Sequence, residues 1–169
     1  MRVAMWRRLR KLGAVYMNEG IWVMPNVPEM RVGVDVAIRE IQNFDGSASA
    51  FVSRDVDLSQ QGRLRARILA ARDEEYAELS GQTDRFFAHV QHATDTRRYT
   101  FAEVEELEEE IAKIEGWLAE IRNRDFFLSP QYQLNKQATQ RAHEVLQAFT
   151  ERAYAESPED VARDRHPSQ

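Results

Sequence analysis

The chain has 169 residues, of which 43% are hydrophobic, so it is long and apolar enough for one domain with a hydrophobic core. It contains no cysteine, and this excludes disulfides, thiol nucleophiles, iron–sulfur clusters and cysteine-ligated zinc. The net charge of −5 argues against a protein that binds nucleic acid over most of its surface. The sequence has no apolar run of membrane-spanning length and no signal-peptide pattern, so we expect a cytoplasmic protein with no membrane partner.

The first predicted element is a basic helix over Arg2–Leu12, which Gly13 ends. The apolar residues of this segment share one face, so its basic side chains are expected to point outward. Residues 1–13 carry no acidic residue, and this is the one predicted element that could be an electrostatic footprint for DNA. The segment is either a solvated basic face or a phosphate-binding surface. The candidate DNA- or phosphate-binding residues are Arg7, Arg8, Arg10 and Lys11.

Two short β-prone runs, Ala14–Met17 and Ile21–Met24, predict a hairpin with a tight turn. A helix over Pro28–Phe44 follows, and Ser47–Ser53 then alternates small and apolar residues in a way typical of a modest strand. One further strand in front would complete the split βαββαβ arrangement of a ferredoxin-like domain. Either that strand lies upstream of residue 1, or the three predicted strands pair in an altered way.

The longest predicted element is an antiparallel hairpin of two helices between Gln60 and Phe127. Apolar residues recur along both helices at the spacing of a coiled-coil seam. The polar turn Thr94–Thr100 joins them, with Thr100 placed to cap the second helix and Glu103 placed to complete a capping box. The seam residues are Leu64, Ile68, Leu79, Phe86 and Val90 in the first helix, and Val104, Leu107, Ile111, Ile114, Leu118 and Ile121 in the second.

At the far end of this hairpin the seam positions are charged instead of apolar. A turn centred near Arg97 would bring the arginines and carboxylates of the two helices within one helical turn of each other, so we predict a buried or half-buried ionic cluster. Burying a charge is costly unless it is paired, so the cluster should be nearly fully paired. It either fixes the register of the two helices or binds an oxyanion, because gathered guanidinium groups are natural oxyanion ligands. Its predicted members are Arg72, Glu75, Arg122, Arg124 and Asp125.

A last helix is predicted over Lys136–Tyr154, and residues 156–169 are expected to form a disordered tail because they are mostly charged, small or proline. We therefore predict a single α+β domain over residues 1–155. Residues 1–55 would form its α/β part, a small ferredoxin-like sheet with or without its first strand. Residues 56–155 would form its helical part, the long antiparallel hairpin and a C-terminal helix.

The sequence contains no P-loop, no dinucleotide fingerprint and no carboxylate pair that can be assigned to a pocket, so we expect no enzymatic activity, no catalytic residue and no cofactor. His89 and His92 lie one helical turn apart, where Glu105 or Glu106 could approach. Two histidines beside a glutamate-rich helix are more often ordinary surface charge pairs than metal ligands. Because no third firm ligand is visible, we expect no metal.

Several blocks of the sequence, in one order along residues 2–150, carry a resemblance to a known family. They are Trp6–Leu9, Leu12–Tyr16 and Gly20–Pro25, then Ala71–Tyr76, then Phe101–Glu110, and finally Ile121–Phe127. These blocks resemble the N-terminal domain of the ChrB chromate-resistance regulators. More distantly, the chain resembles the ferredoxin-like middle domain of PaaX-type repressors. Full-length ChrB members continue into a second, C-terminal domain.

The resemblance implies a bacterial, cytoplasmic transcription regulator that represses a chromate-efflux operon and releases it when chromate is present. On this hypothesis the basic residues of the first helix contact DNA, and the arginines of the ionic cluster hold chromate in competition with Glu75 and Asp125. The alternative is a non-enzymatic protein–protein interaction or dimerisation module built on the helical hairpin, without DNA or anion binding. The expected partners are accordingly DNA, chromate or a similar oxyanion, and a second copy of the chain in a homodimer.

Overall fold

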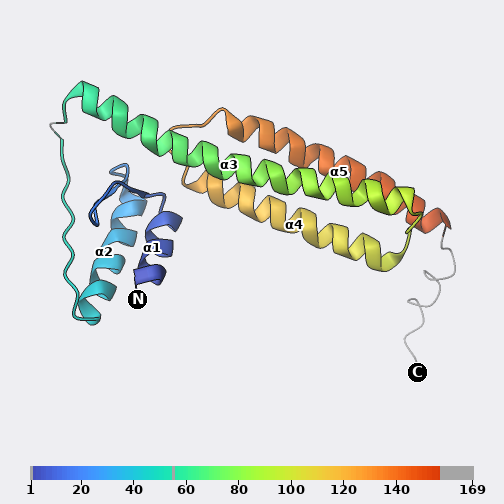
Figure 1. Ribbon diagram of the computed structural model, residues 1–169, viewed down its shortest axis with the longest axis horizontal. Helices are drawn as coiled ribbons and strands as arrows, with labels where there is room; N and C mark the ends of the chain where they lie inside the picture. The colour runs from blue at the N-terminus through green and yellow to red at the C-terminus, as the bar shows by residue number, and fades with distance from the viewer. Residues whose placement is uncertain (1, 55, 157–169) are drawn as a thin grey trace. The chain divides into compact units, whose positions relative to one another are not determined.

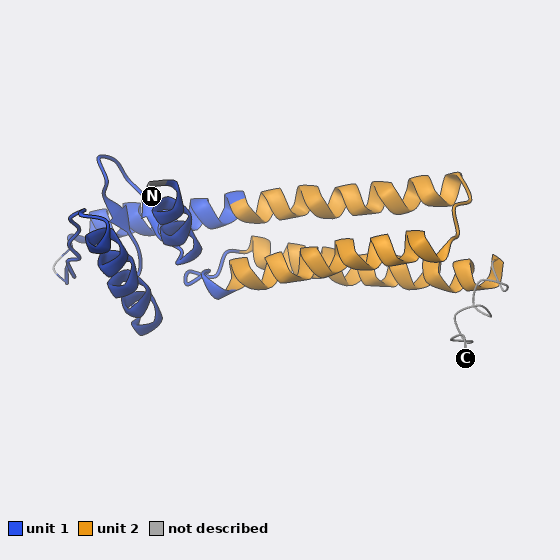
Figure 2. Cartoon of the chain, turned by 90° about the horizontal axis from the view of Figure 1, so that it is seen from below, with its two compact units in different colours: residues 1–74, 123–129 blue, residues 75–122, 130–169 orange. Residues whose placement is uncertain are grey.

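The computed structural model describes residues 2–54 and 56–156, and within these ranges it holds five helices and one two-stranded sheet (Figure 1). The chain divides into two compact units (Figure 2). Unit 1 comprises residues 1–74 and 123–129, and unit 2 comprises residues 75–122 and 130–169. The elements are α1 (Arg2–Lys11), β1 (Val15–Tyr16), β2 (Trp22–Val23), α2 (Pro28–Asn43), α3 (Leu58–Asp95), α4 (Phe101–Asn123) and α5 (Gln131–Glu156).

Unit 1 contains α1, α2, the β1–β2 hairpin and the first part of α3. The two strands are antiparallel, with Val15 opposite Val23 and Tyr16 opposite Trp22. Gly20 in the turn between them has a φ of +85°, which suits a tight hairpin turn. The rings of Tyr16 and Trp22 meet edge-on, with centroids 5.3 Å apart, so the hairpin presents an aromatic pair on one side.

Helix α1 ends in a tight glycine turn. The amide of Ala14 donates to the carbonyl oxygen of Leu9 at 3.0 Å, which is the hydrogen bond across six residues that defines a Schellman-type helix end. Gly13 has a φ of +86°, a conformation in which residues with a Cβ are strained. It is also closely surrounded, because a Cβ at this position would lie 3.0 Å from the Cβ of Arg124 and 3.1 Å from the Cε of Met30. Both demands favour glycine at position 13.

Unit 2 contains the second part of α3, α4 and α5 (Figure 2). One cluster of buried apolar side chains from these helices and from the turn between α3 and α4 holds it together. Burial of each large apolar side chain contributes roughly 1.5–3 kcal/mol relative to exposure, so this cluster is the main source of stability in the unit. Its members are Tyr76, Leu79, Phe86, Val90, Ala93, Tyr99, Val104, Leu107, Ile111, Ile114, Ile121, Ala142, Leu146, Phe149 and Ala153.

The connection between α3 and α4 is a short turn with a defined end on each side. Arg97 has a φ of +52°, and the amide of Arg98 donates to the carbonyl oxygen of Ala93 at 2.8 Å, which ends α3. The amide of Glu103 donates to the Oγ1 of Thr100 at 3.2 Å, which caps α4. The predicted cap at Thr100 is therefore confirmed. The carboxylate of Glu103 takes part in a separate cluster, described below.

The helices expected from the sequence are confirmed with small changes in their bounds, and so is the hairpin between the two strands. The coiled-coil pattern identified the buried face of the long helices. Nine of its eleven residues are buried, and Leu64 and Leu118 are partly buried. The tail predicted over residues 156–169 is wrong at its first residue, because Glu156 is the last residue of α5. The rest of that tail, residues 157–169, lies outside the described residues.

The strand predicted over Ser47–Ser53 is wrong. This segment has no regular structure, and the side chain of Phe51 is 91% exposed. Its serines and alanines offer too little apolar surface to stabilise a strand on a half-buried sheet face. The described residues hold a single two-stranded sheet, so the fold is mostly helical with a small antiparallel sheet. The ferredoxin-like assignment is not confirmed.

Two glycines of unit 1 give a test of the end of α1. Gly13→Ala should lower the free energy of unfolding by about 2 kcal/mol, because the new side chain meets both a left-handed backbone and close contacts to Arg124 and Met30. Gly20→Ala is the matched control, since Gly20 has nearly the same φ and nothing within 4 Å of the added Cβ. It should cost only about 1 kcal/mol. Urea denaturation of both variants measures the difference, and equal costs would show that Gly13 is not sterically enclosed.

Candidate functional site

The basic face predicted for the first helix is present on α1. The side chains of Arg7, Arg10 and Lys11 are exposed, and that of Arg8 is half-buried. Arg8 is also ion-paired to Glu40 of α2. Both partners of this pair are about 40% exposed, at 39% and 44%, so the pair is worth little energy but occupies the Arg8 guanidinium. Three of the four predicted phosphate-binding residues are thus displayed to solvent, and Arg8 faces the neighbouring helix.

Unit 1 also contains a pocket of about 330 Å³ beside α1 and the hairpin. Three of its lining side chains are arginines, Arg10, Arg67 and Arg72, and two are the aromatic residues Tyr16 and Trp22. Small residues also line the pocket, and they leave room for a ligand between the long side chains. The remaining lining residues are Ala14, Val15, Ala70, Ala71 and Glu74.

The arginines of this pocket come from two helices far apart in sequence. Arg10 lies over the ring of Trp6, with its guanidinium carbon 4.8 Å from the ring centroid. Arg67 on α3 donates to the carbonyl oxygen of Tyr16 on β1 at 3.4 Å. Arg72 on the same helix is only 2% exposed. Three arginines and one acidic residue, Glu74, line this small cavity, so its lining carries a net positive charge that suits an anion.

Arg67 is a site residue that was not predicted from the sequence. The signal was present, because Arg67, Ala70, Ala71 and Glu74 follow the three- and four-residue steps of one helix face. On that face the small alanines leave space between two long charged side chains. The pattern did not reveal that the β1–β2 hairpin and Arg10 complete the pocket.

The residues of the predicted ionic cluster come from both units. Arg72 and Asp125, each 2% exposed, and half-buried Arg124 belong to unit 1. Glu75, at 6% exposed, and half-buried Arg122 belong to unit 2. The predicted burial is therefore confirmed for three of the charged side chains, while the oxyanion role of the set stays a prediction.

Asp125 has a clear local role within unit 1. The amide of Ser129 donates to both carboxylate oxygens of Asp125, at 2.9 and 3.2 Å. The hydroxyl of Ser129 donates to the Oδ1 of Asp73 on α3 at 2.5 Å. These bonds close the turn after α4, in which Leu128 has a φ of +58°, and attach the turn to α3. Asp125 is therefore a structural carboxylate as well as a candidate partner for arginine.

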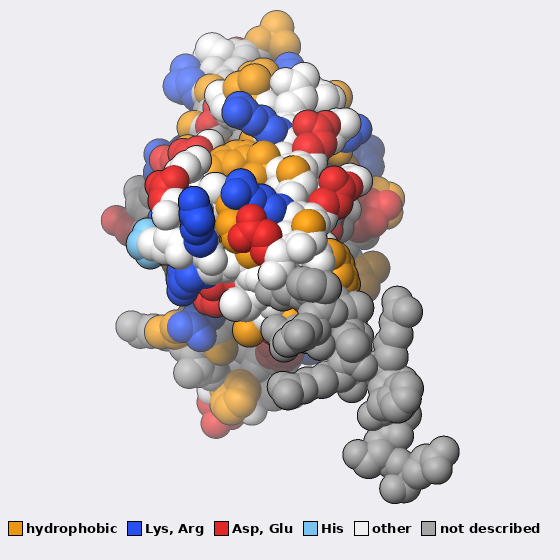
Figure 3. Space-filling model, turned by 90° about the vertical axis from the view of Figure 1, so that its right-hand side faces the viewer, with side chains coloured by type: hydrophobic (Ala, Val, Ile, Leu, Met, Phe, Trp, Pro, Cys, Tyr) orange, Lys and Arg blue, Asp and Glu red, His pale blue; other side chains and the backbone are white. Residues whose placement is uncertain are grey.

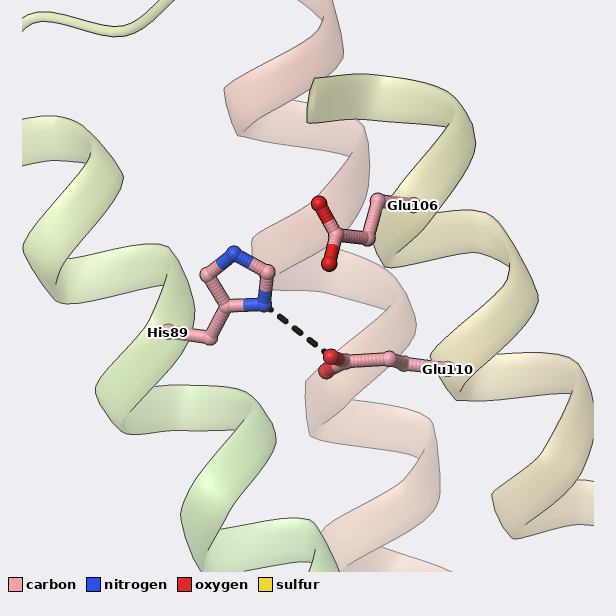
Figure 4. A group of neighbouring side chains, drawn as sticks. All are labelled: His89, Glu106 and Glu110. Atoms are coloured by element: carbon pink, nitrogen blue, oxygen red, sulfur yellow. Dashed lines mark hydrogen bonds and ion pairs between the residues drawn. The ribbon is translucent and has the colours of Figure 1, made fainter. Parts of the chain in front are cut away.

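A second group of charged residues lies in unit 2, between α3 and α4. The imidazole of His89 on α3 has a glutamate at each nitrogen, with the Nε2 2.8 Å from Glu103 and the Nδ1 3.1 Å from Glu110. Glu106 lies beside them on α4 (Figure 4). Burial by itself lowers the pKa of His89, but the hydrogen bonds and charges of Glu110 and Glu103 outweigh it and raise the pKa above its usual value.

Charges are mixed on the face of the molecule that Figure 3 shows. Basic, acidic and hydrophobic side chains are interspersed there instead of gathering by sign. Such a face has little net field to attract a polyanion. The exposed part of α1 differs, because its charged residues are all basic.

The comparison with known families identifies the chain. The family model described as Protein ChrB, N-terminal, matches residues 2–160. The chain belongs to the ChrB N-terminal family. Protein ChrB of Cupriavidus metallidurans is 30% identical to it over 77 residues, which cover 46% of this chain and 23% of that protein. The chain thus matches less than a quarter of that relative's length, and no solved structure matches it significantly.

The family assignment confirms the resemblance to the ChrB N-terminal domain that was drawn from the sequence blocks. The matched range spans α1 to α5, so both charged sites described above lie within the part of the chain that the family shares. None of the described helices combines the length and the apolar character needed to cross a membrane.

Proposed function

We propose that this ChrB-family chain is a transcription regulator of the chromate-resistance type, in which an oxyanion such as chromate modulates DNA binding. The observation that carries the proposal is the position of Arg10. This residue belongs to the exposed basic face of α1 and also lines the arginine pocket of unit 1. A DNA phosphate and a bound oxyanion would therefore draw on the same guanidinium group.

The pocket suits a small tetrahedral dianion. Chromate offers four oxygens and a charge of −2, and guanidinium groups bind such oxygens through short charge-assisted hydrogen bonds. A volume of about 330 Å³ accommodates the anion with several waters, since one water occupies roughly 30 Å³ of liquid. The oxyanion site proposed here is therefore the pocket instead of the predicted ionic cluster, and Arg72 is the residue that the two share.

Competition for Arg10 supplies a two-state switch in this proposal. Without the anion, the Arg10 side chain is available to phosphate along with Arg7 and Lys11. With the anion bound, Arg10 turns its donors into the pocket beside Arg67, and α1 loses a phosphate contact. A ligand shifts such an equilibrium only if its affinity differs between the two states. Here the anion binds more tightly to the state in which Arg10 faces the pocket, and DNA binds more tightly to the state in which Arg10 faces the phosphate.

A second candidate function, an interaction module without DNA binding, is favoured by a different observation. Large apolar side chains are exposed in the segment between α2 and α3 and at its edges: Phe44 at 67%, Phe51 at 91%, Val52 at 58% and Leu58 at 82%. Exposed apolar groups of this kind are common at protein-binding surfaces. A titration with DNA separates the two functions, because only the regulator is expected to bind DNA.

The basic face of α1 is tested by replacing two of its residues that do not line the pocket. Arg7→Ala with Lys11→Ala should weaken binding to DNA from upstream of the chain's own gene. It should also reduce the slope of log affinity against log salt concentration by about 2, since each phosphate contact contributes about 0.9. Fluorescence anisotropy over a salt titration measures both effects.

The matched control is Arg31→Ala with Arg39→Ala, which removes the same charge from exposed positions on α2 of the same unit. This variant should keep the wild-type salt slope. An equal loss of affinity in both double variants would mean that only net charge matters and that α1 is not the DNA-binding face. Absence of DNA binding in the unaltered protein at low salt would favour the interaction module.

The pocket is tested by direct chromate titration. Arg67→Met should weaken chromate binding at least tenfold, because it removes a charge-assisted donor, and a tenfold change corresponds to about 1.4 kcal/mol. Isothermal titration calorimetry at fixed ionic strength measures the affinity. The control is Arg65→Met on the same helix, whose guanidinium lies over the ring of Phe127 and does not line the pocket. Similar losses in the two variants would place the anion elsewhere.

A further inference from the structure

The group of side chains around His89 is independent of the arginine pocket and of α1. Its residues come from α3 and α4 within unit 2. We propose that His89, Glu106 and Glu110 form a binding site for a divalent transition-metal ion, with Glu103 orienting the imidazole.

The backbone places the three glutamates in a row that faces His89. Glu103, Glu106 and Glu110 follow three- and four-residue steps, so they share one face of α4. The helix is anchored beside them by Leu107 and Ile111, which are 0% and 3% exposed. The site thus stands on two packed helices, which hold ligands more precisely than loops do.

The candidate ligand atoms are close enough to share one ion. One ligand atom from each of His89, Glu106 and Glu110 lies within 4.8 Å of the other two. Figure 4 shows the three side chains directed toward a common space between the helices. Ligands about 2.0–2.2 Å from one metal ion lie roughly 3–4 Å apart, so a modest rotation of the glutamates closes the site. Glu106 is exposed and Glu110 half-buried, and both have room to make that movement.

Glu103 gives the imidazole the arrangement found in metal sites. It is 7% exposed, accepts a hydrogen bond from Nε2 of His89 and is ion-paired at 3.2 Å to Arg98. A metal-bound histidine usually donates its other ring N–H to such a carboxylate, which fixes the tautomer and strengthens the ligand. With the proton on Nε2, the lone pair of Nδ1 points toward Glu110 and the metal position.

The donor set indicates which ions fit. One imidazole nitrogen and two carboxylates suit borderline ions such as Zn²⁺ and Co²⁺, whereas the harder ions Ca²⁺, Mg²⁺ and Mn²⁺ are better suited by oxygen ligands. The exposure of Glu106 leaves positions on the ion open to water. The bound ion would link α3 to α4 near their connecting turn and stabilise the hairpin.

The sequence named two of these residues, His89 and Glu106, but did not reveal the complete set. The pair that its spacing suggested was His89 with His92, approached by Glu105 or Glu106. In the described part of the chain, His92 and Glu105 are exposed and are not in the metal-compatible group. The missing third ligand is Glu110, which lies 21 residues from His89 and reaches it only through the folding of the hairpin.

The proposed site is tested by titration of the full chain with Co²⁺, followed by visible absorption and calorimetry, and then with Zn²⁺. One ion should bind per chain, and His89→Gln should weaken binding at least tenfold. Glu103→Gln should weaken it roughly 10–100-fold through loss of the orienting hydrogen bond. The matched controls are His92→Gln and Glu108→Gln, which replace exposed residues of the same types on the same two helices. Both controls should bind as the wild type does.

A second variant distinguishes loss of the metal site from loss of the folded structure. Glu106 is exposed, so Glu106→Gln leaves the packing of the hairpin intact and should still weaken Co²⁺ binding about tenfold. Zn²⁺ should also raise the melting temperature of the wild type and not that of His89→Gln, since an ion that binds only the folded state stabilises it. Absence of one-to-one binding in the wild type would overturn the proposal. Equal affinity in His89→Gln and His92→Gln would also overturn it and leave His89 as a protonated partner of its glutamates.

Discussion

The structure depends on the burial of one apolar stripe along α3. In unit 2 this stripe packs against α4 and α5, and Tyr76, Leu79 and Phe86 are fully buried there. The first part of the same helix belongs to unit 1, where it supplies Arg67 and Arg72 to the pocket. The apolar face of α3 thus makes the core, and its polar positions carry residues of both charged sites. Regular helical geometry fixes the direction of the side chains on each face, so one helix can supply residues to both sites.

The position of the charged residues says more about possible binding surfaces than the net charge does. The net charge is −5, yet α1 displays Arg7, Arg10 and Lys11 with no acidic neighbour in its own sequence. Arg10 belongs to both this surface and the pocket, so the proposed regulator would need no long path between its DNA and its ligand. The metal proposed at His89 is a separate matter, because its ligands lie in unit 2 and none of them lines the pocket.

The sequence predicted the features that depend on local periodicity. Steps of three and four residues identified the helices and the buried face of the α3–α4 hairpin, and Thr100 identified the start of α4. The alternation of small and apolar residues over Ser47–Ser53 led to a wrong prediction of a strand. A strand also needs a partner strand and enough apolar surface, and the sequence of seven residues does not show whether it has them. The sequence blocks were enough to indicate the family. A resemblance of this kind depends only on which residues the blocks contain and on the order of the blocks, and it can be seen without knowledge of the fold.

The site residues that the sequence missed are those defined by contacts between distant segments. Arg67 meets the carbonyl oxygen of Tyr16 across 51 residues, and Glu110 meets His89 across 21. Neither pair can be found by spacing along one helix, because each depends on how two elements pack. Burial of Arg72, Glu75 and Asp125 was predictable, since charged residues occupied positions at which the seam required apolar ones.

In the proposed regulator, an oxyanion and DNA compete for the basic surface of unit 1. The most direct measurement is the anisotropy of labelled DNA from upstream of the chain's own gene, bound to the chain at low salt and titrated with chromate or with sulfate at constant ionic strength. We expect chromate to release the DNA at concentrations where sulfate does not. No release by chromate would contradict this competition, and equal release by the two dianions would contradict the proposed preference for chromate.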